Sequence, residues 1–220
     1  MSTPGGGAAA RADLIRAHVE HHLGPVAGIV NAGPGHGIDL DILHVEATET
    51  KPFHVLITSG MSDLPMTVPE DVEEATPWAE LVLGLDASWP FEPEHISDDR
   101  YAWPLKVLAS LARLPHAHDM WFGPGHTVPN GNPPTPYIAG SELCGALIAP
   151  PVAMPPDFVH LALPEGRLDF LAVVPVYAEE MKMKLERGTQ ALFERFDAHD
   201  INEIMVPNRR KVAGGLFELL

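Results

Sequence analysis

Two dense apolar runs separated by an acidic, proline-rich segment constrain the fold of this chain more than any other feature. The run at 53–58 is rich in β-branched and aromatic residues, and the run at 78–83 is apolar enough for a strand buried on both faces. The segment between them contains three prolines and four acids: Pro65, Pro69, Pro77, Glu70, Asp71, Glu73 and Glu74. Because such a segment cannot be buried, the sequence predicts two core strands joined by a surface loop.

The other apolar patterns predict further strands and helices around this pair. Strands are expected at 38–42, 143–149, 158–163 and 168–174, the last as a central strand. Helices are expected near 10–23, 104–114 and 177–196, with Gly188 as a candidate break, and the glycine-rich stretch 31–37 as a loop. This order of elements predicts an α+β fold, a mixed β-sheet with helices packed against it.

The length allows one large domain or two small ones, and because no repeat or clean linker is visible the sequence predicts one globular domain at 8–220 after a disordered tail at 1–7. Hydrophobic residues make up 45% of the 220 residues, which is enough for a sizeable core. No apolar run reaches membrane-spanning length, and the first residues have no signal-peptide pattern. Cys144 is the only cysteine and cannot form an intrachain disulfide, so a cytoplasmic location without membrane attachment is expected.

The charge of the chain excludes one class of partner and favours another. Fourteen basic and thirty acidic residues give a formal net charge of −16. Nucleic-acid binding needs a basic surface that replaces phosphate counterions, so no nucleic-acid partner is expected. Acidity favours fast association with a basic protein, although solubility alone also accounts for it.

Candidate catalytic and metal-binding residues do not form a recognisable set. His18 and His22 share a helical face, but no third ligand stands at a usable spacing. The sequence contains no Gly-x-Ser-x-Gly nucleophile motif, and Cys144 lies in an apolar strand. We therefore predict no catalytic residue, metal or cofactor, and leave a hydrolase using the region of Ser59 and His126 as a less favoured alternative.

Several short motifs occur in a fixed order along the chain. They are Thr58-Ser59-Gly60-Met61-Ser62, Pro65-Met66, Trp103-Pro104-Leu105, Gly125-His126-Thr127-Val128, Asp169-Phe170-Leu171, Val174-Pro175-Val176 and Glu179-Glu180. In this order the motifs resemble the bacterial members of the Suppressor of fused family, over about residues 30–213. None of them indicates a reaction.

The resemblance implies a SUFU-like globular domain that binds protein. Animal members of the family hold Gli-type transcription factors through a peptide added as a strand between two lobes, and this chain resembles their N-terminal domain. An aspartate that helps to grip that peptide has no acidic counterpart near 125–132 here. Bacterial members include immunity proteins encoded beside polymorphic toxins, which implies an inhibitory complex with a cognate toxin, for example a basic nuclease domain. A regulatory scaffold that binds a peptide by strand addition is the alternative.

Two stretches are the candidate partner-binding surfaces. The first combines the acidic loop with the neighbouring Met61, Met66 and Trp78, and the second is the family-like segment 125–132. The residues proposed are Met61, Met66, Glu70, Asp71, Glu73, Glu74, His126, Thr127 and Asn130. The sequence does not specify the partner or the oligomeric state.

Overall fold

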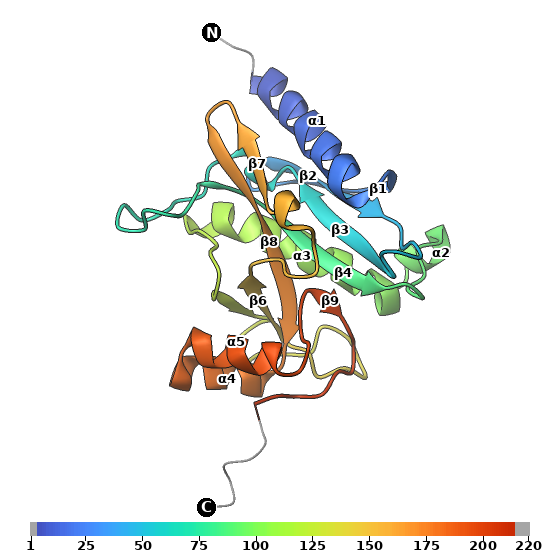
Figure 1. Cartoon of the computed structure of the whole chain (residues 1–220), viewed down its shortest axis with the longest axis vertical. Helices are drawn as coiled ribbons and strands as arrows, with labels where there is room; N and C mark the ends of the chain where they lie inside the picture. The colour runs from blue at the N-terminus through green and yellow to red at the C-terminus, as the bar shows by residue number, and fades with distance from the viewer. Residues whose placement is uncertain (1–3, 214–220) are drawn as a thin grey trace, which may run out of the picture.

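The protein is built on one mixed, nine-stranded β-sheet. The computed structural model describes residues 4–213, and Figure 1 shows the sheet running through the middle of the molecule. The main strand order is β1-β2-β3-β4-β8-β6-β5, with β7 added beside β8 and β9 beside β4. The strands are β1 Val26–Gly35, β2 Ile38–Val45, β3 Phe53–Ser59, β4 Trp78–Asp86, β5 Thr127–Pro129, β6 Gly145–Ala149, β7 His160–Leu163, β8 Gly166–Val176 and β9 Ile204–Met205.

The centre of the sheet is the parallel pair β4 and β8. Leu81 lies opposite Leu171 in this pair, and every residue from Ala79 to Leu85 in β4 is buried. Strand β3 also pairs antiparallel with β2, with Val45 opposite Val55. The apolar run at 168–174 is confirmed as a central strand, because β8 is flanked by β4 on one side and by β6 and β7 on the other.

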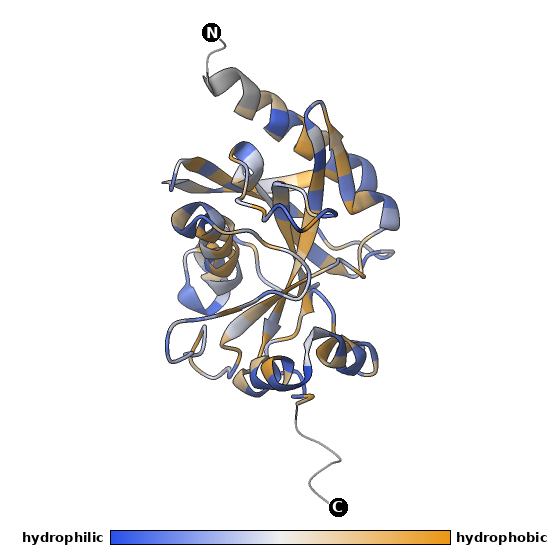
Figure 2. Ribbon diagram, turned by 90° about the vertical axis from the view of Figure 1, so that its left-hand side faces the viewer, coloured by the Kyte–Doolittle hydropathy of each residue, from blue (hydrophilic) through white to orange (hydrophobic). Residues whose placement is uncertain are grey.

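Helices cover both faces of the sheet, which confirms the predicted α+β class. The α-helices are α1 Pro4–Leu23, α2 Pro93–Ile96, α3 Asp99–His118, α4 Ala178–Arg187 and α5 Thr189–Asp197. Helix α3 packs on one face, while α1 and the pair α4–α5 pack on different parts of the other. In Figure 2, apolar residues are concentrated along the strands between these layers.

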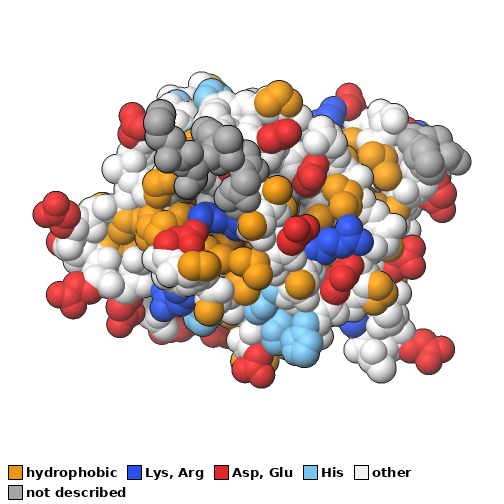
Figure 3. All heavy atoms as spheres, turned by 90° about the horizontal axis from the view of Figure 1, so that it is seen from above, with side chains coloured by type: hydrophobic (Ala, Val, Ile, Leu, Met, Phe, Trp, Pro, Cys, Tyr) orange, Lys and Arg blue, Asp and Glu red, His pale blue; other side chains and the backbone are white. Residues whose placement is uncertain are grey.

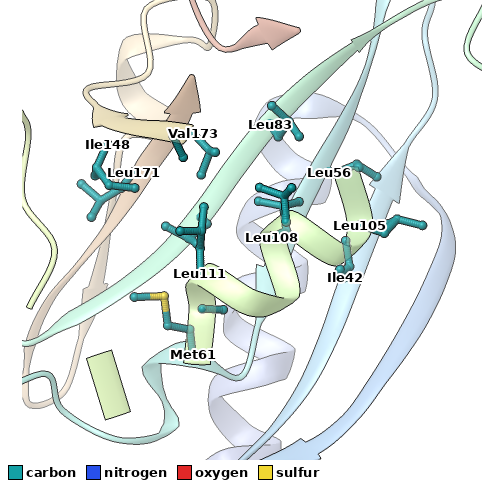
Figure 4. Close-up of a cluster of buried hydrophobic side chains, with 14 of the residues drawn as sticks. Ile42, Leu56, Met61, Leu83, Leu105, Leu108, Leu111, Ile148, Leu171 and Val173 are labelled. Carbon is teal, nitrogen blue, oxygen red and sulfur yellow. The ribbon is translucent and has the colours of Figure 1, made fainter. Parts of the chain in front are cut away.

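The largest buried cluster lies between α3 and the sheet. Figure 4 shows Leu105, Leu108 and Leu111 of α3 pointing toward the strands, where Ile42 and Leu56 lie. Leu108 has no exposed surface. Burying one such leucine stabilises a fold by about 1.5–3 kcal/mol, so α3 contributes strongly to the core.

Three element boundaries differ from the sequence-based expectations. Helix α1 begins at Pro4 rather than near residue 10, so four residues of the expected tail belong to it, and residues 1–3 lie outside the described part. Helix α3 begins after its N-cap Asp98 and continues past Pro115, because one missing N–H near a helix end is a small loss. Most of the expected loop at 31–37 instead belongs to strand β1, which ends at Gly35, and the turn is confined to His36 and Gly37.

Candidate functional site

A groove with a volume of about 1020 Å³ opens beside the start of β4. Three segments far apart in the sequence form its walls: the loop that leads into β4, the stretch after α3, and the β7–β8 hairpin. We call it the tryptophan groove. Its lining residues are Met66, 72–79, 121–124, His160, Gly166, Arg167, Asp169 and Leu171. A space of this size accommodates several side chains of a ligand.

The floor of the tryptophan groove is apolar and its aromatic walls are partly exposed. Met66, Phe122 and Leu171 are buried, whereas Trp78 and Trp121 are half-buried and each leaves part of its indole uncovered. Figure 3, which views the molecule from above, shows apolar side chains gathered on the upper face of the molecule, with acidic and basic groups among and around them. Partly exposed tryptophans above an apolar floor are the composition of a binding surface.

Hydrogen bonds fix the loop that forms one wall. The Met66 N–H donates to the Pro77 carbonyl at 2.8 Å, which closes the base of the loop. The Arg167 guanidinium donates to the Glu74 carbonyl at 2.9 Å, and the Thr76 hydroxyl donates to the Arg167 carbonyl. The acidic loop is therefore attached to the β7–β8 hairpin, and the groove is a preformed feature of the fold.

The charges around the rim are of two kinds. Asp169 is paired with Arg167, at 2.7 Å, and with His160, at 2.8 Å. Glu73 and Glu74 are exposed, and within residues 4–213 neither carboxylate has an ion-pair partner. The rim therefore carries acids that are free to meet a cationic group from another molecule.

A fully buried glutamate anchors the turn from which the acidic loop starts. Glu80 accepts hydrogen bonds from the Thr58 hydroxyl at 2.6 Å, the Ser62 hydroxyl at 2.7 Å, and the Gly60 and Ser62 amides at 3.0 Å. Burial raises the pKa of Glu80, and these four donors oppose that rise. Gly60 has φ 122°, and a Cβ there would lie 2.1 Å from the Asp39 carbonyl, so only glycine fits.

The structure distributes the predicted residues of the acidic loop unevenly. Glu73 and Glu74 line the tryptophan groove, and Met66 lies in its floor. Glu70 and Asp71 are exposed in the same loop but do not line the groove. Met61 has no exposed surface, so its side chain is a core residue that a partner cannot touch directly.

His126, from the second predicted stretch, contacts the tryptophan groove through Trp121. The His126 ring packs edge-on against Trp121 with centroids 4.8 Å apart, and its Nδ1 lies 3.2 Å from the Trp121 carbonyl. His126 therefore supports a wall of the tryptophan groove. Asn130 instead closes a turn, since its side-chain amide donates to the Thr135 carbonyl at 2.8 Å.

A smaller groove of about 280 Å³ lies between α3 and the edge strand β5. Its lining includes Trp103, Tyr137, Val128, Pro129 and Asn130, and the rings of Trp103 and Tyr137 stack with centroids 5.5 Å apart. We call it the β5 groove. Thr127 belongs to β5 but does not line this groove.

The backbone of β5 offers little to an added strand. Val128 pairs with Ala146, the Asn130 N–H donates to the Cys144 carbonyl, and the His126 carbonyl accepts from Ile148. By the alternation of an antiparallel ladder, the backbone groups of Thr127 and Pro129 point away from β6. Proline has no N–H, so Thr127 is the one residue of this three-residue strand with both groups available.

The residues of the hydrolase alternative do not come together. Ser59 is buried at the end of β3, and His126 precedes β5, with β4, β8 and β6 between those two strands. At about 4.8 Å per strand, this order separates the strands by roughly 19 Å. Cys144 is buried, and burial raises its thiol pKa, which suppresses nucleophilic thiolate.

The described part of the chain also contains no cluster of metal ligands. Among residues 4–213, no three histidine, cysteine, aspartate or glutamate side chains are placed to hold one ion. In the same range, no helix is long and apolar enough to cross a bilayer.

Sequence reasoning missed the hairpin wall of the groove. His160 and Arg167 belong to no local motif, and Asp169 stands in the Asp169-Phe170-Leu171 motif but was not proposed as a site residue. The three residues reach the acidic loop because β8 pairs with β4. Trp121 did leave a signal, since a tryptophan inside a glycine- and proline-rich stretch has few core positions to occupy.

Comparison with known proteins gives a consistent result. A family model described as "Suppressor of fused protein (SUFU)" matches residues 37–210. A SUFU homologue from Neisseria gonorrhoeae FA 1090 superposes with a TM-score of 0.64 at 17% identity, covering 94% of this chain and 100% of that chain. No curated protein matches the chain at the same level of significance.

Two further solved structures share the fold. The chain in the Sufu-Fu complex superposes with a TM-score of 0.64 at 15% identity, covering 94% of this chain and 92% of that chain. Drosophila Suppressor of Fused superposes with a TM-score of 0.63 at 14% identity, covering 91% of this chain and 50% of that chain. At these identities the likeness concerns the fold alone.

Proposed function

The chain belongs to the Suppressor of fused family, and from this premise we propose that it is a protein-binding domain that acts by holding a partner rather than by catalysis. One relative of the same fold is described as the Sufu-Fu complex, in which a family member holds another protein. The observation that carries the proposal is the tryptophan groove. Its apolar floor, two partly exposed indoles and unpaired rim acids fit a protein surface.

We further propose that the partner is the basic toxin domain of a bacterial polymorphic toxin system, and that the chain is its cytoplasmic immunity protein. The net charge of −16 supports this, because it accelerates encounter with a basic domain. The fold is shared with a bacterial homologue that is matched over its whole length. Residues 8–220 would then act as one SUFU-like domain.

Peptide binding by strand addition is the second candidate, and the edge of β5 is its natural place. The aromatic side chains beside this edge favour it. Pro129 counts against it, because it removes one of the donors that an added strand would use. We therefore prefer a partner held by side chains in the tryptophan groove.

The decisive experiment uses the toxin domain encoded beside the gene. We expect the purified chain to bind that domain and to abolish its activity at equimolar ratio. Reversing Glu70, Asp71, Glu73 and Glu74 to lysine should slow association several-fold or more at ~0.01 M salt, and less at ~0.15 M, where the Debye length is about 8 Å. Association would be followed by stopped-flow or surface-based kinetics.

A matched control separates the loop from the total charge. Reversing four exposed acids near α4 and α5, Glu186, Glu194, Asp197 and Asp200, changes the net charge equally at the other end of the molecule. Association should then slow much less. A neighbouring toxin domain that neither binds nor loses activity would contradict the proposed function.

A further inference from the structure

Glu73 and Glu74 line the tryptophan groove without ion-pair partners among residues 4–213, unlike the third acid of the groove, Asp169. Asp169 is neutralised locally by its ion pair with Arg167, and the His160 ring also contacts its carboxylate. Glu73 and Glu74 line the same groove, and within residues 4–213 neither carboxylate forms an ion pair, although the Arg167 guanidinium binds the Glu74 backbone carbonyl. A net negative rim therefore stands directly above an apolar floor.

The aromatic walls are placed to receive a flat or aliphatic side chain. Trp78 is held at one end of the groove, where Gly166 packs against its ring and the Arg11 guanidinium lies 5.7 Å from its centroid. Trp121 is held by the His126 ring and by Gly123, whose missing side chain leaves room for the indole. Both indoles are thus fixed before any ligand arrives, which reduces the entropy lost on binding.

Resting on the proposed function, we infer that the tryptophan groove binds a segment of a partner protein that presents a lysine or arginine beside an aromatic or aliphatic side chain. The apolar side chain lies between Trp78 and Trp121, and the cationic group meets Glu73 and Glu74. The charge of the rim selects the cation, and the indoles supply most of the contact area.

The loop contains its own control for this inference. Glu70 and Asp71 precede the groove acids by three residues, are also exposed, and do not line the groove. Removing either pair of charges changes the net charge of the chain and of the loop by the same amount. Only the Glu73 and Glu74 pair should determine how tightly a bound cation is held.

The test uses two defined peptides and the four tryptophans as site-resolved reporters. The probe is acetyl-Gly-Phe-Lys-Phe-Arg-Gly-amide, and its counterpart carries glutamate and aspartate in place of lysine and arginine. Trp78 and Trp121 report on the tryptophan groove, Trp103 reports on the β5 groove, and Trp89 lines neither. Indole N–H resonances, assigned by single Trp→Phe substitutions, are followed during titration of the intact chain.

We expect the basic peptide to shift the resonances of Trp78 and Trp121 with saturation, and the acidic peptide to shift neither. In the variant E73Q/E74Q, the affinity for the basic peptide should fall about fivefold or more, whereas E70Q/D71N should change it less than about twofold. Shifts confined to Trp103, equal shifts with both peptides, or equal effects of the two variants would overturn the inference.

The outcome is separable from that of the proposed function. If the neighbouring toxin domain binds but the peptide leaves Trp78 and Trp121 unchanged, the groove is not the recognition site and the inference alone fails. If the peptide binds as expected but the toxin domain does not, the inference stands and the immunity role fails.

Discussion

Two fully buried glutamates, Glu80 and Glu180, hold two ends of the molecule in different ways. Glu80 anchors the turn before the acidic loop with four neutral donors. Glu180 anchors the C-terminal segment 201–213 through a bidentate pair with Arg209, at 2.5 and 2.7 Å. The Tyr177 and Val212 amides complete its contacts.

The difference follows from where the partners lie in the sequence. The donors to Glu80 come from the end of β3 and the turn that follows it, so a few consecutive residues surround the carboxylate. Arg209 arrives from a segment about thirty residues beyond Glu180, and an ion pair can fix such a segment with one side chain. Strand β9 and the Glu203 carboxylate also hold this segment, so what a single substitution can remove is the charge compensation of Glu180. Losing Arg209 should therefore cost more than losing one of the neutral donors to Glu80.

The largest effect is expected from Arg209→Met. It leaves the Glu180 carboxylate buried without its cation and removes the stacking of Arg209 on Tyr177 and Phe196. Losing one partner of a buried pair costs about 3–5 kcal/mol. Chemical denaturation measures this, with Glu180→Leu/Arg209→Met as the control that removes both charges and should recover part of the loss. A single variant as stable as the wild type would show that Arg209 is not needed to compensate the buried charge of Glu180.

Glu80→Gln should destabilise the fold less, by about 1–3 kcal/mol. The amide oxygen of glutamine can still accept hydrogen bonds from some of the donors, but its N–H₂ group would face donors that now lack an acceptor. Burial raises the pKa of Glu80 in the folded protein. Its contribution to the free energy of unfolding is therefore present below the ordinary glutamate pKa, and it is lost as pH rises from that pKa through the raised pKa of the folded state. The difference in unfolding free energy between wild type and Glu80→Gln should therefore shrink as pH rises. A difference that is constant with pH would contradict this assignment.

The sequence predicts the central elements because their signals are local. The dense apolar runs of β3, β4 and β8 and the break at Gly188 between α4 and α5 are all found in the structure. Strand β1 was missed because its glycines, alanines and Pro34 lack strand propensity. An edge strand tolerates them: among the described strands β1 pairs with β2 alone, and Arg113 binds the Ala32 and Gly33 carbonyls.

The candidate site was only half predictable for a related reason. The acidic loop is visible as composition, and Glu73 and Glu74 were identified from it. The opposite wall depends on contacts between residues about ninety positions apart, such as Arg167 with Glu74. No local sequence pattern predicts a contact between residues so far apart. The hydrogen-bonding role of Glu80 was also not predictable, because in a sequence a single buried glutamate within an apolar strand looks like an exposed position.

The smallest effect is expected from Lys211→Gln, two residues after Arg209 in the same segment. Lys211 also forms ion pairs with two carboxylates, with Glu142 at 2.7 Å and Glu179 at 3.0 Å, and these acids raise its pKa. All three side chains face solvent, so water already solvates the charges and little is lost when the pairs break. The two variants thus compare ion pairs that share a segment and differ in burial. In about 1 M salt, where the Debye length is ~3 Å, Lys211→Gln should unfold like the wild type while Arg209→Met keeps its deficit. If salt instead reduced both deficits equally, burial of Glu180 would not be what gives the Arg209 pair its larger effect.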